Sequence, residues 1–202
     1  MPGSKGIRFG SLGDHWVHLC VDMQRMFADQ TPWATPWLHR ILPMAITLVD
    51  HAPERTVFTR FIPRESPQHA SGTWRRYYER WPEMTLERID RDLIEVVPEL
   101  ARFAPPARVF DKQVYSPWSP ALHAYLSQAH VDTLVVSGAE TEVCVLATVL
   151  GAIDRGYRTI VATDAICSSA DETHDSMMTI YHSRFGMQVE TAEVAEIIEA
   201  AP

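Results

Sequence analysis

The sequence predicts an α/β protein in which helices cover both faces of a parallel β-sheet. Strand-like runs alternate with helix-like runs from residue 15 almost to the end of the chain, as is typical of parallel sheets. Two runs, TLVVSG at 133–138 and TIVATD at 159–164, consist almost only of apolar or small residues, as strands buried on both faces do. No internal repeat or second-domain boundary interrupts the pattern. We therefore expect a single domain over residues 14–202, preceded by a flexible, glycine-rich lead-in at residues 1–13.

Each strand is expected where a short apolar or β-branched run occurs. The six runs are HWVHLCVDM at 15–23, TVFTRFI at 56–62, RVFDKQ at 108–113, TLVVSG at 133–138, TIVATD at 159–164 and QVETA at 188–192. The first helix is expected at about 36–50, with Thr35 as N-cap and Pro36 at the first helical position. Further helices are expected at about 93–103, 121–129, 142–155, 172–185 and 192–201, with Gly156 stopping the third of these.

Residues 63–84 depart from this alternation, because they combine prolines with the aromatic residues Trp74, Tyr77, Tyr78 and Trp81. Long irregular segments in compact domains often form lids or binding loops. A surface excursion whose aromatic side chains pack on the domain, or on another subunit, is equally consistent with this composition.

Composition narrows the range of functions. The formal net charge of −8 disfavours a nucleic-acid or anionic-membrane partner. No apolar run is long enough to span a bilayer, and the first residues lack the apolar core of a signal peptide. Three cysteines, Cys20, Cys144 and Cys167, cannot form a complete disulfide framework, so a reducing, cytoplasmic compartment is expected.

Three chemically active residue types fall at or just beyond predicted strand ends, where ligands bind in open parallel sheets. Asp22 ends the first strand, Lys112 lies near the end of the third, and Cys144 begins the helix after the fourth. In the first turn of a helix, free N–H groups and the helix dipole favour a thiolate. A lysine beside the carboxylate would keep it charged, and the carboxylate would take the thiol proton.

Each of these residues also has a purely structural explanation. A free cysteine is among the most buried residue types, and a lone aspartate more often caps a loop or forms a structural ion pair. Cys20, among apolar residues in mid-strand, is expected to fill the core, and Cys167 has no predicted role. The combination of Asp22, Lys112 and Cys144 is what favours nucleophilic catalysis.

Three motifs carrying these residues resemble the isochorismatase-like cysteine hydrolases, which include nicotinamidases and N-carbamoylsarcosine amidases. The motifs are VDMQRMF at 21–27, FDKQVYSPW at 110–118 and SGAETEVCVLATVLGAIDRGY at 137–157. The resemblance implies a three-layer, Rossmann-like α/β/α fold whose six parallel strands have the order 3-2-1-4-5-6. In that order the third strand lies two strands from the first, about 10 Å away. Lys112 must then reach across with its side chain, or its strand must bend inward.

The resemblance also implies the details of a catalytic site. The residues would be Asp22, Lys112 and Cys144, with a cis peptide between Ala139 and Glu140. The backbone N–H groups of Glu140 and Cys144 would form an oxyanion hole. The reaction would hydrolyse a small amide, N-carbamoyl or ureide C–N bond through a thioester. Homodimers or homotetramers are also implied.

The sequence departs from the nicotinamidase branch where that branch carries an Asp-x-His metal motif. Phe61 and Pro63 stand at these positions, and neither can bind a metal ion. No metal or other cofactor is therefore expected, and nicotinamide is disfavoured as a substrate. Five residues near the motifs are candidates for substrate binding, although ordinary packing explains the aromatic ones equally well: Gln24, Phe27, Trp74, Tyr115 and Trp118.

Two other classes of function compete with this interpretation. A nucleotide-binding module would need a glycine-rich loop after the first strand, whereas the sequence there is DMQR at 22–25. A non-catalytic member of the family, serving as a binding protein, is disfavoured because all three expected catalytic positions are filled.

Overall fold

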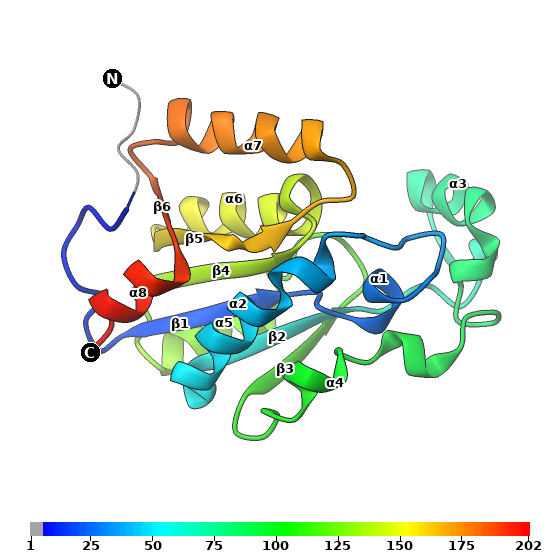
Figure 1. Ribbon diagram of the computed structural model, residues 1–202. Helices are drawn as coiled ribbons and strands as arrows, with labels where there is room; N and C mark the ends of the chain where they lie inside the picture. The colour runs from blue at the N-terminus through cyan, green and yellow to red at the C-terminus, as the bar shows by residue number, and fades with distance from the viewer. Residues whose placement is uncertain (1–5) are drawn as a thin grey trace.

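Six parallel strands form one sheet in the order β3-β2-β1-β4-β5-β6 (Figure 1). The computed structural model describes residues 6–202. The strands are β1 (Trp16–Val21), β2 (Thr56–Phe61), β3 (Arg108–Lys112), β4 (Thr133–Ala139), β5 (Arg158–Cys167) and β6 (Val189–Ala192). The predicted α/β class and the strand order 3-2-1-4-5-6 are therefore confirmed. The order reverses between β1 and β4, so a crevice is expected beyond their carboxyl ends.

Helices cover both faces of the sheet (Figure 1). They are α1 (Arg25–Ala28), α2 (Leu38–His51), α3 (Gly72–Arg80), α4 (Pro98–Ala101), α5 (Pro120–Gln128), α6 (Leu146–Asp154), α7 (Asp171–Ser183) and α8 (Val194–Ala200). Apolar side chains of α2, α4 and α8 pack on one face. Those of α5, α6 and α7 pack on the other.

The central strand β1 shows why the sheet is buried on both faces. Trp16 and Cys20 pack under α2, whereas Val17 and Leu19 point to the opposite face, toward α5. Successive side chains of a strand point to opposite faces, so an apolar residue is needed at nearly every position. Cys20 is fully buried in this core, as predicted, and burial raises the pKa of its thiol to about 12.

The polar exception within β1 is His18, which is fully buried and linked to both neighbouring strands. Its Nδ1 lies 3.3 Å from Thr56 Oγ1 on β2, and its Nε2 lies 2.7 Å from Ser137 Oγ on β4. Burial lowers the pKa of His18 to about 3, so the imidazole is neutral at physiological pH. A neutral ring with a partner at each nitrogen avoids the cost of burying an unpaired polar group.

Three expectations about local structure need correction. The first long helix starts at Leu38 rather than Pro36, and Trp37 rather than Thr35 is its N-cap. The region 93–103 is not one helix but a 3₁₀ turn at Arg91–Ile94 followed by the short α4. Residues 63–84 are not wholly irregular, because they contain α3, which stands beyond the carboxyl ends of the strands (Figure 1).

The lead-in predicted at residues 1–13 lies partly outside the described residues, which begin at residue 6. From there onward it is held against the domain rather than loose. The Gly6 N–H donates to Thr191 O at 2.7 Å, the Arg8 N–H donates to Glu190 Oε1 at 2.6 Å, and Leu12 is buried. Across the described part of the chain, every helix falls short of the length and apolarity that a bilayer span requires.

Candidate active site

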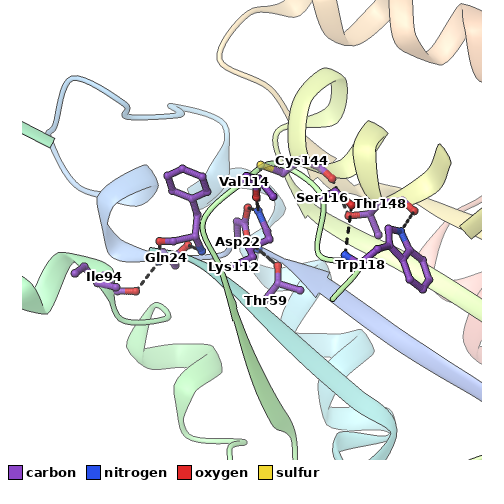
Figure 2. Close-up of polar contacts among 11 residues, drawn as sticks. Asp22, Gln24, Thr59, Ile94, Lys112, Val114, Ser116, Trp118, Cys144 and Thr148 are labelled. Atoms are coloured by element: carbon purple, nitrogen blue, oxygen red, sulfur yellow. Dashed lines mark hydrogen bonds and ion pairs between the residues drawn. The ribbon is translucent and has the colours of Figure 1, made fainter. Parts of the chain in front are cut away.

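Asp22 and Lys112 form a buried ion pair at the carboxyl edge of the sheet (Figure 2). Lys112 Nζ donates to Asp22 Oδ2 at 2.6 Å, and the two side chains are only 4% and 1% exposed. Thr59 Oγ1 on β2 donates to the other oxygen, Asp22 Oδ1, also at 2.6 Å. Both oxygens of the carboxylate thus have a donor, which offsets the cost of removing the charge from water.

The backbone at Asp22 is unusual. Its φ of 51° lies in the left-handed region, which aspartate tolerates better than most side chains do. The Asp22 N–H donates to Thr59 O at 3.2 Å, which holds the residue beside the end of β2. Backbone outliers of this kind concentrate at functional sites.

Lys112 reaches Asp22 by extending its side chain across the intervening strand β2. It pairs in register with Phe61, the last residue of β2, and its Nζ lies 5.2 Å from the centre of the Phe61 ring. Nζ also donates to Val114 O at 3.2 Å. Burial disfavours the ammonium ion, but the negative charge of Asp22, with a further effect of Cys144, raises the pKa of Lys112 above its ordinary value.

Cys144 approaches the Asp22–Lys112 pair from β4, across the point between β1 and β4 where the strand order reverses. It lies in a π-helical turn, Thr141–Val145, which joins β4 to α6. Single π turns of this kind occur frequently at functional sites. The Cys144 Sγ lies 3.5 Å from Lys112 Nζ. The structure therefore brings the three predicted residues together, as Figure 2 shows.

The protonation of Cys144 differs from the sequence expectation. Burial, and then the neighbouring Asp22 carboxylate, raise the pKa of the Cys144 thiol well above its ordinary value, and Lys112 opposes this shift. A position near a helix start predicts the reverse. The residue is only 7% exposed, so loss of solvation outweighs the favourable backbone dipoles. The shift favours the neutral thiol over the thiolate at this position.

The segment before Cys144 contains an unusual peptide bond. The peptide between Ala139 and Glu140 is cis. The Glu140 carbonyl accepts hydrogen bonds from the Val143 and Val145 N–H groups at 3.0 and 3.1 Å. Burial raises the pKa of the Glu140 carboxyl, against the opposing effect of hydrogen bonds with Ser169.

A cavity of about 230 Å³ opens beside Cys144, and its walls are mostly aromatic. The lining residues are Phe27, Trp33, Phe61, Tyr77, Tyr115, Glu140, Val143 and Cys144. Of the five residues predicted to bind substrate, Phe27 and Tyr115 lie in this wall. Trp74 lies one layer behind, with ring centres 4.9 Å from Tyr115 and 6.0 Å from Phe61. Trp74 lines an outer hollow of about 440 Å³ instead.

Two predicted substrate-binding residues have structural roles instead. Gln24 is fully buried; its Oε1 accepts from the Phe61 N–H, and its Nε2 donates to the carbonyls of Phe61 and Ile94 (Figure 2). Trp118 Nε1 donates to Thr148 O at 3.0 Å, and its ring stacks on Tyr157. Neither Gln24 nor Trp118 lines the cavity, and the polar atoms of both side chains already have partners within the protein.

Sequence reasoning missed Trp33 as a wall residue and placed Tyr77 only in a loop of uncertain role. Trp33 occupies the middle of the aromatic group, with ring centres 5.5 Å from Tyr77 and 6.0 Å from Phe61. It lies in an irregular connection between α1 and α2, where no periodic pattern signals a contact. The only available sequence signal was the density of aromatic residues near the strand ends.

The remaining candidates carry no catalytic geometry. Cys167 is buried at the end of β5, paired in register with Ala139, and burial raises its pKa. Phe61 and Pro63, at the positions of the nicotinamidase metal motif, are both buried. Within residues 6–202, no group of three or more histidine, cysteine, aspartate or glutamate residues could hold a metal ion.

The chain is similar to known proteins over most of its length. The family model of the isochorismatase domain matches residues 17–193. An uncharacterized isochorismatase family protein of Bacillus subtilis, YwoC, is 29% identical over 108 residues, which are 54% of this chain and 57% of that protein. The first curated relatives are matched over only 32% to 57% of their own length.

Solved structures of other proteins share the fold. A cysteine hydrolase from Pseudomonas syringae pv. phaseolicola 1448A has a TM-score of 0.82 and 21% identity, over 98% of this chain and 97% of that one. N-carbamoylsarcosine amidase from Thermoplasma acidophilum has a TM-score of 0.71 and 21% identity, over 90% and 97% of the two chains. At this level of identity the likeness establishes the arrangement of strands and helices.

Proposed function

Since the chain belongs to the isochorismatase family of hydrolases, we propose that it is a cysteine-dependent hydrolase. Its substrate would be a small amide, N-carbamoyl or ureide compound, cleaved at a C–N bond. The observation that carries the proposal is the buried contact of Asp22, Lys112 and Cys144 beside a cavity. The similar N-carbamoylsarcosine amidase structure supports this class of substrate.

The first half of the proposed reaction forms a thioester. Asp22 accepts the Cys144 proton as the sulfur attacks the carbonyl carbon, so a C–S bond forms and the carbonyl oxygen becomes an oxyanion. The Glu140 and Cys144 N–H groups would stabilise this oxyanion, which is worth about 3–4 kcal/mol per donor in comparable sites. Asp22 then gives its proton to the leaving nitrogen, the C–N bond breaks, and ammonia or an amine departs.

The second half regenerates the enzyme. Water attacks the thioester while Asp22 accepts one of its protons, the C–S bond breaks, and the sulfur recovers that proton from Asp22. The product is the carboxylic or carbamic acid. The high pKa of Cys144 supports a mechanism in which proton transfer accompanies attack rather than precedes it. Lys112 stays charged throughout and lies within reach of both the carboxylate and the sulfur.

The test is an ammonia-release screen over small primary amides, ureides and carbamoyl compounds. Cys144→Ala protein serves as the blank, and intact-mass measurement looks for the acyl adduct on Cys144. We expect Cys144→Ala and Cys144→Ser to abolish turnover while circular dichroism shows an unchanged fold. Undiminished turnover by the alanine variant would remove the nucleophilic mechanism.

A further inference from the structure

We infer that the cavity beside Cys144 selects amides whose acyl part carries a compact alkylammonium cation, held by an aromatic cage with Glu140 as its acidic member. This inference rests on the proposed hydrolase function for the reaction, but it concerns which substrates enter the cavity. Its basis is the chemistry of the cavity walls.

The walls form a cage of rings. Five of the eight lining residues are aromatic: Phe27, Trp33, Phe61, Tyr77 and Tyr115. They come from four separate parts of the chain: α1 and the connection after it, the end of β2, α3, and the turn after β3. Trp33 contacts three of the others, with ring centres 6.3 Å from Phe27, 6.0 Å from Phe61 and 5.5 Å from Tyr77. Aromatic cages of this type bind alkylammonium groups through the negative faces of the rings.

One of these rings already interacts with a cation. The Lys112 Nζ lies 5.2 Å from the centre of the Phe61 ring, within the range of a cation–π contact. That ammonium is committed to Asp22 at 2.6 Å, so it offers little to a substrate anion. The aromatic wall therefore tolerates positive charge, while the nearest positive side chain is already neutralised.

The charge on the lining is acidic. Glu140 is the only lining residue with a charged side chain among those named for the cavity. Burial is the main cause that raises the pKa of Tyr77 and of Tyr115, and the charge of Glu140 adds to both shifts. Arg60, on β2 next to Phe61, is held elsewhere by Asp111 at 2.8 Å and Glu95 at 2.6 Å. A substrate that carries a carboxylate would thus enter a cavity lined by the acidic side chain of Glu140, while the nearby Arg60 and Lys112 are already paired with carboxylates.

The size of the cavity sets the scale of the ligand. At about 230 Å³ it is smaller than the roughly 300–1,000 Å³ of pockets for drug-sized molecules. A small amide with one compact substituent matches this volume. Shape alone would admit a neutral branched alkyl group equally well, so charge is the property to vary.

The first experiment compares turnover of three amides. Betaine amide and 3,3-dimethylbutanamide have the same shape and differ in a quaternary nitrogen or carbon, while succinamic acid carries a carboxylate. We expect kcat/KM for betaine amide to exceed that of its neutral isostere by about tenfold, with succinamic acid the poorest. Equal or faster turnover of the neutral amide would overturn the inference and leave the proposed hydrolase function intact.

The second experiment measures binding without chemistry. Choline and 3,3-dimethylbutan-1-ol are again isosteres, and calorimetric titration of the intact protein gives the affinity of each. Tyr77→Leu and Glu140→Gln should lower the affinity for choline more than the affinity for the alcohol. Tyr125→Leu, an aromatic change on α5 outside the cavity, is the matched control and should not alter the ratio.

The two proposals fail in different ways. If the protein binds choline but hydrolyses no amide, the proposed hydrolase function is contradicted and the aromatic cage is supported. Absence of saturable choline binding, or a ratio unchanged in both Tyr77→Leu and Glu140→Gln, would overturn the cage. Urea unfolding of each variant shows whether it is folded before its affinity is compared.

Discussion

Replacement of Lys112 by methionine removes the cation from the buried pair while keeping the length and apolar volume of the side chain. The Asp22 carboxylate, with a side chain only 1% exposed, would then lose its cationic partner and keep the neutral Thr59 hydroxyl as a donor, at 2.6 Å. Leaving one partner of a buried ion pair uncompensated costs about 3–5 kcal/mol. For a chain of this length, that loss lowers the melting temperature by about 6–20 °C.

The assay is urea unfolding of wild-type, Lys112→Met, Asp22→Asn and the double variant, analysed as a double-mutant cycle. The double variant should recover much of the loss, because a neutral buried pair no longer carries an unsatisfied charge. A loss below about 1 kcal/mol, or strictly additive single variants, would contradict a coupled buried pair.

Three further predictions follow from separate features. Gly138 has a φ of 106°, and an added Cβ would strike the backbone of β1. Gly138→Ala should therefore cost about 2–5 kcal/mol, whereas Gly156→Ala, with φ of 80° and open space, should cost only about 1–2 kcal/mol; equal losses in urea unfolding would refute the steric argument. Burial lowers the pKa of His18 from 6.5 to about 3. Between these two pH values, His18 therefore binds a proton in the unfolded chain but not in the folded protein. Wild-type stability should fall as the pH drops from 6.5 toward 3, by up to about 5 kcal/mol from this residue, and His18→Gln should lack that component. Finally, Asp22→Asn removes a charge that raises the pKa of Cys144, so iodoacetamide should label Cys144 faster at a given pH; slower labelling by mass spectrometry would contradict the assigned cause.

The strands were predictable because their burial leaves a simple pattern. In β4 and β1 nearly every residue is apolar or small, and both strands are buried on both faces. The end of β5 was harder, since it continues past Asp164 to Cys167. Asp164 stays within the strand because its Oδ1 accepts the Val194 N–H at 2.9 Å, a contact that no local pattern reveals.

The first long helix shows where periodicity alone is ambiguous. Its sequence is apolar around much of the helix, so more than one apolar stripe can be drawn. Trp37 and Met44 are apolar yet 38% and 36% exposed, while Leu42 and Val49 are buried. The side that faces the sheet is fixed by how α2 crosses β5 and β4, which is a tertiary property.

The active-site residues also include some that the sequence predicts and some that it does not. Asp22, Lys112 and Cys144 could be placed together because strand ends meet at one edge of a parallel sheet. Trp33 and Tyr77 could not, since they come from connections whose course depends on packing against each other. The contacts of Gln24 with backbone groups could not be predicted, because a polar residue after a strand end looks the same in sequence whether its amide faces a ligand or satisfies the backbone.

In the proposed mechanism, the arrangement of charges would allow a buried thiol with a raised pKa to act as a nucleophile. Before attack the cluster holds a carboxylate, an ammonium and a neutral thiol; as the proton moves during attack, the carboxyl becomes neutral, the ammonium is unchanged and negative charge develops at the sulfur. The net charge is unchanged, so no additional charge has to be buried as the proton moves. What moves is the position of the negative charge, from Asp22 to Cys144. Lys112 Nζ contacts both positions, at 2.6 Å from Asp22 Oδ2 and 3.5 Å from Cys144 Sγ. As negative charge develops on the sulfur, the longer contact would shorten. The ammonium would then stabilise the sulfur in place of the carboxylate.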